Sequence, residues 1–488
     1  MLALFLIGML TLAFNIQLAK AESTTIIVPD DYEKIQWAIG NASAGDTIFV
    51  KAGIYYEHIV VNKSLSLIGE NRSNTIIDGS GVGKVTEVTA DNVTIIGFTV
   101  RNGGVMEVDE CAIALSHVKN CNISGNYVTR TMDLYQHGIY LESSSNNSIT
   151  GNIIIRNPLY GVALTYSSNN NIVSGNYIED NSIGIGVEYS SNYNSIAGNS
   201  ILENLHGIAL LTSCNNNTVS GNNITNNQYD AFHLIWSSNN TISGNNIANN
   251  NRGIYLYDFA DNRIYHNNFI DNTQQVYDYS WDHQEYSNSI NSWDDGYPSG
   301  GNYWSNYTGV DANMDGIGDS SYEIDPDNVD HYPLMGTFYD CPTTLEELTC
   351  HITTVCNSTI SAFQFDQINN ILRFNVTGEE GVGFCRACIP HDLIEPPYTV
   401  TVDGYSPQYV NYTLYDNWTH RWIYFTYQHS THEVIITQTP SAPVGGISIP
   451  VNKLELLTPY IALTILLAVA VVTVFYVKKR KRNTETNS

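Results

Sequence analysis

A repeat of about 23 residues in the middle of the chain constrains the fold more than any other feature. Each unit opens with Gly or Ala and continues with alternating apolar residues. The units start at Gly138, Gly161, Gly184, Gly207, Ala231 and Gly253. A period this short leaves room for strands and turns, but not for a strand followed by a crossover helix. The repeat therefore indicates a solenoid in which successive units stack.

The alternation within each unit is typical of a β-strand. In the first clear unit, Ile139 and Leu141 are apolar, and Tyr140 and Glu142 alternate with them. Because side chains of a strand point alternately to opposite faces, the first pair should be buried and the second pair should face outward. Turns rich in Asn, Gly and Ser separate the strands. The pattern predicts an all-β chain built on a parallel β-helix, whose core comes from stacking of the coils.

Asparagines also recur once per coil. One series contains Asn152, Asn176, Asn199, Asn222 and Asn245, and a second contains Asn157, Asn181, Asn204, Asn227 and Asn250. Stacked amides hydrogen-bond to one another in cross-strand arrays. We therefore expect two asparagine ladders that run through the solenoid.

The two ends of the chain indicate its location. Residues 1–21 have an apolar run followed by Ala19-Lys20-Ala21, which is typical of a cleaved signal peptide. Residues 456–477 contain no charged residue and predict one C-terminal transmembrane helix. The basic tail, residues 478–488, should stay in the cytoplasm. These features predict a single-pass protein of the cell membrane with an extracellular N-terminal body.

The rest of the chain divides into segments of different character. We expect the β-helix over residues 22–290, with a capping helix near Asp30–Ile39, a C-terminal cap over 291–336, a small β-sandwich over 337–440, and a stalk over 441–455. Five cysteines lie in the sandwich segment, which suits disulfides in an oxidising compartment. A four-thiolate zinc site of Cys350, Cys356, Cys385 and Cys388 is the alternative.

The charge balance excludes one class of partner. The chain has 21 basic and 48 acidic residues and a formal net charge of −27. Such a protein repels phosphate backbones, so we expect no nucleic-acid binding. We expect contact with a membrane only through the C-terminal helix.

The sequence resembles a known family over roughly residues 26–336. The opening VPDDYEKIQWAIGNASAGDTIFVKAGIYYEHIVVNKSLSLIGEN, followed by GI-L-SSNN-SGN units, is similar to β-helix proteins of the carbohydrate-binding and sugar-hydrolase class. It is most similar to the family named for the NosD copper-accessory protein, which is common on archaeal cell surfaces. The resemblance implies a right-handed, single-stranded, pectin-lyase-like parallel β-helix. It specifies the fold strongly and the chemistry poorly.

Exposed aromatic residues form the candidate ligand face. The outward positions hold Tyr140, Tyr166, Tyr189, His233, Trp236, Tyr255 and Tyr257. Aromatic rings beside acids and amides suit sugar binding, because a ring can cover the apolar face of a pyranose. We expect binding of a polysaccharide, a surface glycan or envelope proteins without catalysis. The alternative is an ordinary solvated sheet face.

A catalytic alternative uses two carboxylates. Glu142 and Glu188 share one outward position two coils apart, about 9.6 Å at roughly 4.8 Å per coil. That separation is near the upper limit for an inverting glycosidase pair. The corresponding function would be a polysaccharide-degrading enzyme, either a lyase or a glycoside hydrolase.

Copper handling, as in NosD, is a further alternative that the spacing of histidines opposes. His137 and His206 hold the same position three coils apart, about 14 Å. His233 is displaced by one coil from His206, which leaves at most a pair. Since metal–nitrogen bonds are about 2 Å long, we expect no dedicated copper site.

A calcium-type loop follows the solenoid. It offers side-chain oxygens of Asp311, Asn313, Asp315 and Asp319, a turn at Gly316 and the backbone carbonyl of Ile317. Glu323 stands one place beyond the usual closing Glu and would require a different exit geometry. We expect a structural calcium ion here, and a merely acidic turn is the alternative.

Overall fold

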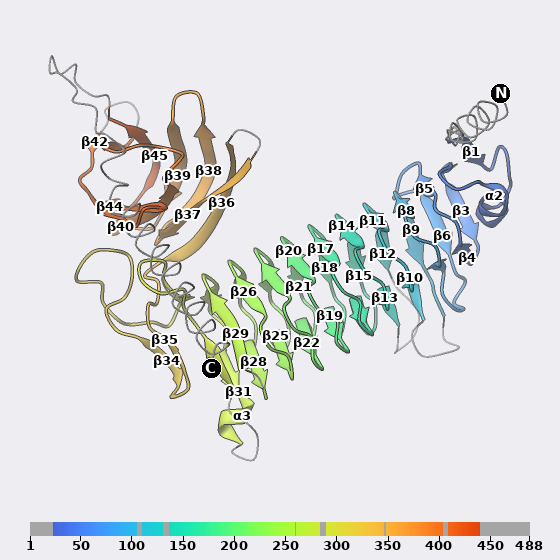
Figure 1. The fold of residues 1–488 in the computed structure, drawn as a ribbon, viewed down its shortest axis with the longest axis horizontal. Coiled ribbons are helices and arrows are strands. Elements are labelled where there is room, and N and C mark those ends of the chain that lie inside the picture. Colours follow the sequence, from blue (N-terminus) through green and yellow to red (C-terminus); the bar gives the residue numbers. More distant parts are fainter. Residues whose placement is uncertain are drawn as a thin grey trace, which may run out of the picture. The chain divides into compact units, whose positions relative to one another are not determined.

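The computed structural model describes residues 23–104, 110–129, 136–258, 260–283, 289–345, 348–403 and 408–439 (Figure 1). The predicted signal peptide, stalk, transmembrane helix and basic tail lie outside these ranges. Among the described residues, no helix has the length and apolar character that crossing a membrane requires.

The solenoid consists of three parallel sheets, and each coil between the two ends contributes one strand to each sheet. Sheet A contains β1 (Thr25–Val28), β2 (Thr47–Val50), β5 (Ser66–Gly69), β8 (Thr94–Ile96), β11 (Asn122–Ser124), β14 (Ser148–Thr150), β17 (Ile172–Ser174), β20 (Ser195–Ala197), β23 (Thr218–Ser220), β26 (Thr241–Ser243), β29 (Ala260–Tyr265) and β32 (Ile290–Ser292). Sheet B contains β3 (Gly53–Tyr56), β6 (Thr75–Asp78), β9 (Thr99–Arg101), β12 (Tyr127–Thr129), β15 (Ile153–Ile155), β18 (Tyr177–Glu179), β21 (Ser200–Leu202), β24 (Asn223–Thr225), β27 (Asn246–Ala248), β30 (Asn268–Ile270) and β33 (Tyr303–Trp304).

Sheet C has the longest strands and carries the candidate site. It contains β4 (Ile59–Val61), β7 (Thr86–Val88), β10 (Cys111–Ser116), β13 (His137–Glu142), β16 (Tyr160–Thr165), β19 (Ile183–Glu188), β22 (His206–Leu211), β25 (Asp230–Ile235), β28 (Arg252–Tyr257) and β31 (Gln274–Asp278). Helix α2 (Ile35–Asn41) buries Ile35, Ala38 and Ile39, and helix α3 (Tyr279–Asp282) follows β31. The parallel β-helix predicted from the repeat is confirmed.

The registers of sheet C place the repeat units directly above one another. One column reads Ile139, Val162, Ile185, Ile208, Phe232 and Ile254. All six side chains are fully buried in the core of the solenoid. The predicted alignment of the units and the inward assignment of these residues are therefore confirmed.

Close approach of the coils explains why the units begin with glycine. A Cβ atom at Gly161 would lie 2.7 Å from the carbonyl oxygen of Gly184 in the next coil, and a Cβ at Gly184 would lie 2.6 Å from that of Gly207. Contacts this short are repulsive, and backbone atoms cannot rotate away from them. Glycine permits such an approach because it has no side chain.

Asparagine ladders join each coil to the next. Oδ1 of Asn222 accepts hydrogen bonds from both the backbone N–H and the Nδ2 of Asn199, each at 2.9 Å. Nδ2 of Asn199 also donates to the carbonyl of Val173 in the preceding coil. Both predicted ladders have this pattern. A third ladder, which we did not predict, contains Asn147, Asn171, Asn194, Asn217, Asn240, Asn262, Asn291 and Asn328.

Asp330 ends the ladder that passes through Asn222. It lies in β35 (Asn328–Asp330), which forms a hairpin with β34 (Tyr322–Asp325). Its Oδ2 accepts from the backbone N–H of Asn302 and from Nε1 of Trp304, both at 2.8 Å. Burial raises the pKa of Asp330 to about 7, although these hydrogen bonds act in the opposite direction.

Two five-stranded antiparallel sheets form the sandwich and share one core. The first contains β36 (Thr337–Leu345), β37 (Leu348–Cys356), β40 (Val382–Pro390), β44 (His420–Gln428) and β43 (Tyr412–Asp416). The second contains β38 (Thr359–Asp366), β39 (Ile371–Thr377), β45 (Thr431–Gln438), β41 (Tyr398–Val402) and β42 (Gln408–Tyr409).

Cys385 is buried in this core opposite Cys356, whereas Cys388 lies three residues further along β40 and so faces the other side. The four-thiolate zinc alternative is therefore wrong.

Neighbouring asparagines provide a test of the ladder. Replacing the buried Asn222 with Ala leaves amide groups of two adjacent coils without partners, so the free energy of unfolding should fall by about 2–4 kcal/mol. Replacing Asn223, whose side chain is exposed and accepts a hydrogen bond from Asn246, should change it by less than about 0.5 kcal/mol. Urea denaturation of both variants measures the difference. Equal losses would contradict a structural role for the ladder.

Asp330 predicts a pH dependence of stability. Its pKa is about 7 in the folded protein and near the ordinary value of 3.8 after unfolding. Between these values the folded protein retains a proton that the unfolded chain has released, so stability falls as the pH rises from about 4 to about 7. Asp330→Asn keeps an acceptor oxygen but cannot ionise. In urea denaturation across this pH range, the free energy of unfolding of the variant should fall by roughly 2–4 kcal/mol less than that of the wild type. The exposed Asp180→Asn should leave it unchanged.

Candidate functional site

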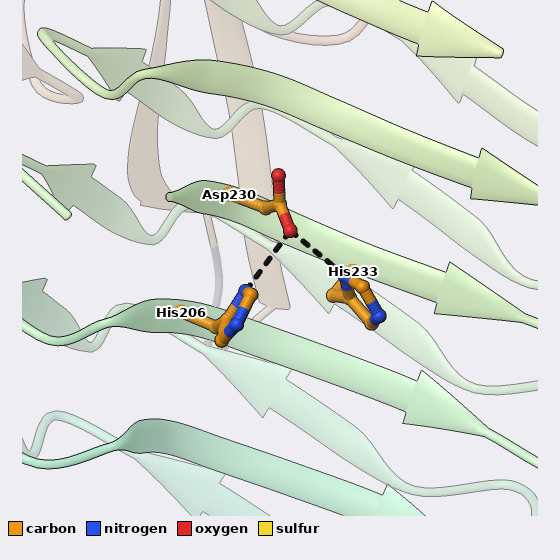
Figure 2. A group of neighbouring side chains, drawn as sticks. All are labelled: His206, Asp230 and His233. Carbon is orange, nitrogen blue, oxygen red and sulfur yellow. Dashed lines mark hydrogen bonds and ion pairs between the residues drawn. The ribbon is translucent and has the colours of Figure 1, made fainter. Parts of the chain in front are cut away.

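Asp230 is the centre of a polar cluster on the outer face of sheet C (Figure 2). Its Oδ2 accepts hydrogen bonds from Nδ1 of His206 at 2.9 Å and from Nδ1 of His233 at 2.7 Å. Its Oδ1 accepts from Nε of Arg252. These residues come from three successive coils, in β22, β25 and β28. The carboxyl group is fully buried, whereas its three partners are each about a quarter exposed.

The surroundings of Asp230 keep it ionised. Burial alone raises the pKa of this carboxyl group, but hydrogen bonds from His206 and His233 and the positive charge of Arg252 outweigh that effect. The pKa of Asp230 therefore lies well below its usual range. At neutral pH the group is a carboxylate and can only accept hydrogen bonds.

Aromatic rings surround this cluster. The ring of Tyr255 stacks on His233 with centroids 4.7 Å apart, and Tyr229 lies 5.4 Å from His206. The guanidinium of Arg252 lies 4.7 Å from the ring centre of Tyr255. It also lies 5.6 Å from that of Tyr277 in the next coil. The cluster thus combines fixed polar groups with flat apolar surfaces.

Further aromatic residues follow the C-terminal ends of the strands of sheet C. Trp236 is 51% exposed, and its Nε1 donates to Oδ2 of Asp258 at 3.0 Å. Tyr166 and Tyr189 are each 46% exposed and stack on one another with centroids 4.9 Å apart. Tyr257 lies 5.7 Å from Trp236. Six of the seven predicted ligand-face residues are thus at least partly exposed.

Tyr140 is the exception, and its assignment to an exposed ligand face is wrong. Only 2% of this residue is exposed. Its ring lies 4.8 Å from that of His137 and packs in a separate apolar cluster with Cys111 and Ala163. Alternation predicts on which face of the sheet a side chain lies, but it does not predict whether neighbouring side chains cover that face.

The two candidate catalytic carboxylates lie where the spacing predicted them. The register places Glu142 beside Thr165, and the same column continues to Glu188 one coil later. Thr165 is buried between them, and the hydroxyl of Tyr160 donates to Glu188. Their catalytic role remains a prediction.

The histidines show an arrangement that sequence spacing did not resolve. His206 and His233 form the expected pair, and Asp230 joins them. Within the described ranges, only these three residues place His, Cys, Asp or Glu ligand atoms of at least three side chains within 4.8 Å of one another. However, both carboxylate oxygens already bind protein groups, and Arg252 brings a positive charge to the site. This donor set fits an ion-pair network rather than a copper site.

Arg252 and Tyr277 belong to the site but were missed in the sequence. The register pairs Asp230 with Arg252, and Tyr255 with Tyr277. One column of outward-facing residues continues from Asp230 to Arg252, and another continues from Tyr255 to Tyr277. Following each column into the next coil would therefore have identified both residues. Arg252 stands immediately before Gly253, the position that His206 holds before Gly207.

Hydrogen bonds within the calcium-type loop hold several of its predicted ligands, but ligand oxygens of Asp311, Asp315 and Asp319 do not all lie within 4.8 Å of one another. Asp311 accepts from the backbone N–H groups of Asp315 at 3.0 Å and Gly316 at 2.8 Å, and Asp319 accepts from that of Ala312 at 2.8 Å. Burial and the charge of Asp315 raise the pKa of Asp311. Asn313 donates to Asp315, and Ile317 is buried. Glu323 lies apart in β34, and among the described residues no hydrogen bond links it to the loop. Calcium binding remains a prediction.

The fold defines a parallel β-solenoid protein with a polar and aromatic outer face. Residues 39–227 and 205–309 match the family model described as periplasmic copper-binding protein (NosD), which together covers more than half of the chain. The chain therefore belongs to the NosD family, as the opening segment and the repeat units indicated.

Individual relatives match shorter stretches. The chain is 36% identical over 132 residues to a cell surface glycoprotein of Methanothermus fervidus, covering 26% of this chain and 21% of the relative. It is 41% identical over 86 residues to a probable ABC transporter binding protein NosD of Stutzerimonas stutzeri, covering 17% of each. The matches thus span about a fifth of these relatives. The structure of pectate lyase Pel9A is similar over 60% of this chain and 84% of that one, with 15% identity and a TM-score of 0.42.

Calcium titration tests the loop. After chelation, isothermal titration with CaCl₂ should show one tight site, and the ion should raise the melting temperature because it binds only the folded loop. Asp315→Asn should weaken binding at least tenfold, a loss of about 1.4 kcal/mol. Asp366→Asn changes an exposed acidic turn of the sandwich and should have no effect. If the wild type takes up no calcium, the calcium prediction is wrong and the loop is only an acidic turn.

Proposed function

We propose that this protein is anchored in the cell membrane and uses the outer face of its β-helix to bind polysaccharide at the cell surface. The observation that carries this proposal is the cluster of His206, Asp230, His233 and Arg252 beside the rings of Tyr255 and Tyr277. The name of the Methanothermus fervidus relative supports a location at the cell surface. The anchor is the transmembrane helix predicted from residues 456–477.

The chemistry of the face supports a sugar ligand. Pyranose rings present an apolar face that packs on aromatic side chains, and their hydroxyl groups need fixed hydrogen-bonding partners. Rings and polar groups lie side by side in the coils that contain β22, β25, β28 and β31, so an extended chain of sugars can contact successive coils. Surface glycans and glycosylated envelope proteins carry the same groups and are the expected partners.

Catalysis on the same face is a second candidate, favoured by one specific observation. Asp230 orients two imidazoles, and an oriented imidazole is a common general base. Arg252 adds a positive group that can neutralise a developing negative charge. This arrangement is closer to the requirements of a lyase than of a glycoside hydrolase, since the latter needs two carboxylates beside the scissile bond. Copper handling is a weaker candidate because the donor set fits that metal poorly.

A polysaccharide array tests the proposal. The purified full-length protein in detergent should bind at least one polysaccharide, and Tyr255→Ala with Trp236→Ala should weaken that binding at least tenfold, or about 1.4 kcal/mol. Tyr193→Ala removes an exposed tyrosine from a turn outside sheet C and should not change the affinity. Calcium is added to one arm and chelated in the other.

Incubation with the bound polysaccharide separates the two candidates. Binding without release of reducing or unsaturated ends supports a binding protein. Turnover that His233→Ala abolishes would instead identify an enzyme. If no polysaccharide is retained on the array, sugar binding by this face is wrong.

A further inference from the structure

We propose that Asp230 makes the site selective for hydroxyl groups of uncharged sugars, because it holds both His206 and His233 in the tautomer whose Nε2 atom accepts hydrogen bonds. This inference rests on the proposed function and names its ligand class. Asp230 is a positioning residue: it is fully buried and does not itself reach a ligand.

The position of the ring protons follows from the contacts of Asp230. Each imidazole approaches Oδ2 through its Nδ1 atom, as Figure 2 shows. Because an ionised carboxylate has no proton to donate, each Nδ1 must carry the hydrogen of its bond. A neutral imidazole has only one N–H group. Each Nε2 atom of the neutral rings is therefore an acceptor.

Both acceptors are available to a ligand. The side chains of His206 and His233 are 25% and 23% exposed. In the described part of the chain, the only hydrogen bonds of these rings are those through Nδ1. The two ring centroids lie 4.9 Å apart, which is close to the distance between neighbouring coils. Two acceptors therefore face the ligand from adjacent coils.

Arg252 supplies the complementary donors. Only its Nε binds Asp230, and the guanidinium has four further N–H groups. The side chain is 24% exposed and lies over the ring of Tyr255. A sugar hydroxyl can donate to an imidazole and accept from a guanidinium at the same time, while the pyranose ring packs on Tyr255.

Charge favours uncharged sugars over uronates. The negative charge of Asp230 cancels the positive charge of Arg252, so the cluster has no net charge when both imidazoles are uncharged. A carboxylate on the ligand would face the lone pairs of both Nε2 atoms, and the whole chain has a formal net charge of −27. A hydroxyl group meets no such repulsion.

Nitrogen NMR tests the tautomer without any ligand. In ¹⁵N–¹H correlation spectra at about pH 8, His206 and His233 of the full-length protein should show a protonated Nδ1 and an unprotonated Nε2. Asp230→Asn offers an amide N–H group to one ring, so at least one histidine should change to the Nε2–H form. Asp258→Asn changes a carboxylate of the same face that binds Trp236, and it should leave both tautomers unchanged. An Nε2–H form of both rings in the wild type would overturn the inference.

Titration with two probes tests the ligand class. Dextran represents uncharged polysaccharides and polygalacturonate represents anionic ones, and dextran should bind at least tenfold more tightly at about pH 8. His233→Phe keeps the stacked ring but removes one acceptor, and it should weaken dextran binding about tenfold while the His206 tautomer stays the same. Preference for polygalacturonate would overturn this inference but not sugar binding. Binding of neither probe, together with an array that retains no polysaccharide, would overturn both.

Discussion

Hydrogen bonding between stacked coils is the interaction on which the rest of the structure depends. Each ladder asparagine is buried, and a buried amide without partners costs free energy. Most of its partners lie in the neighbouring coils, so a coil cannot satisfy all of its buried amides by itself. The ladders consequently need a terminal partner. Asp330 supplies it for one ladder and Gln275 for another.

The same stacking builds the candidate site. His206, Asp230 and Arg252 are separated by about one coil in the sequence, and the register brings them into one column. The side chains stand on strands that two neighbouring coils hold in place, which limits their movement. A carboxylate can therefore be kept fully buried with three partners, and it can orient groups that the ligand would meet. In this solenoid the position of a side chain along the coil decides which residues of adjacent coils it contacts.

Features that depend on the period of the repeat could be predicted from the sequence. Features that depend on neighbouring side chains could not. The inward column from Ile139 to Ile254 and two of the three asparagine ladders follow from spacing alone. Tyr140 has an outward position, but surrounding side chains bury it. Arg252 was missed although it stands before a glycine, as His137 and His206 do. Cys385 and Cys388 resemble a metal-binding pair in the sequence, yet their separation by three residues in a strand sends them to opposite faces.

The amino-acid sequence by itself determined the β-helix, its core and its family, because a repeat this regular permits only one way of stacking apolar faces. It also provided the tyrosines, histidines and acids of the outer face. Only the tertiary structure decided which of these side chains contact one another. Asp230 binds two imidazoles and a guanidinium, and neighbouring side chains bury Tyr140. The reason is that burial and hydrogen bonding at an outer position depend on side chains one coil away, whose size and direction no periodic pattern specifies.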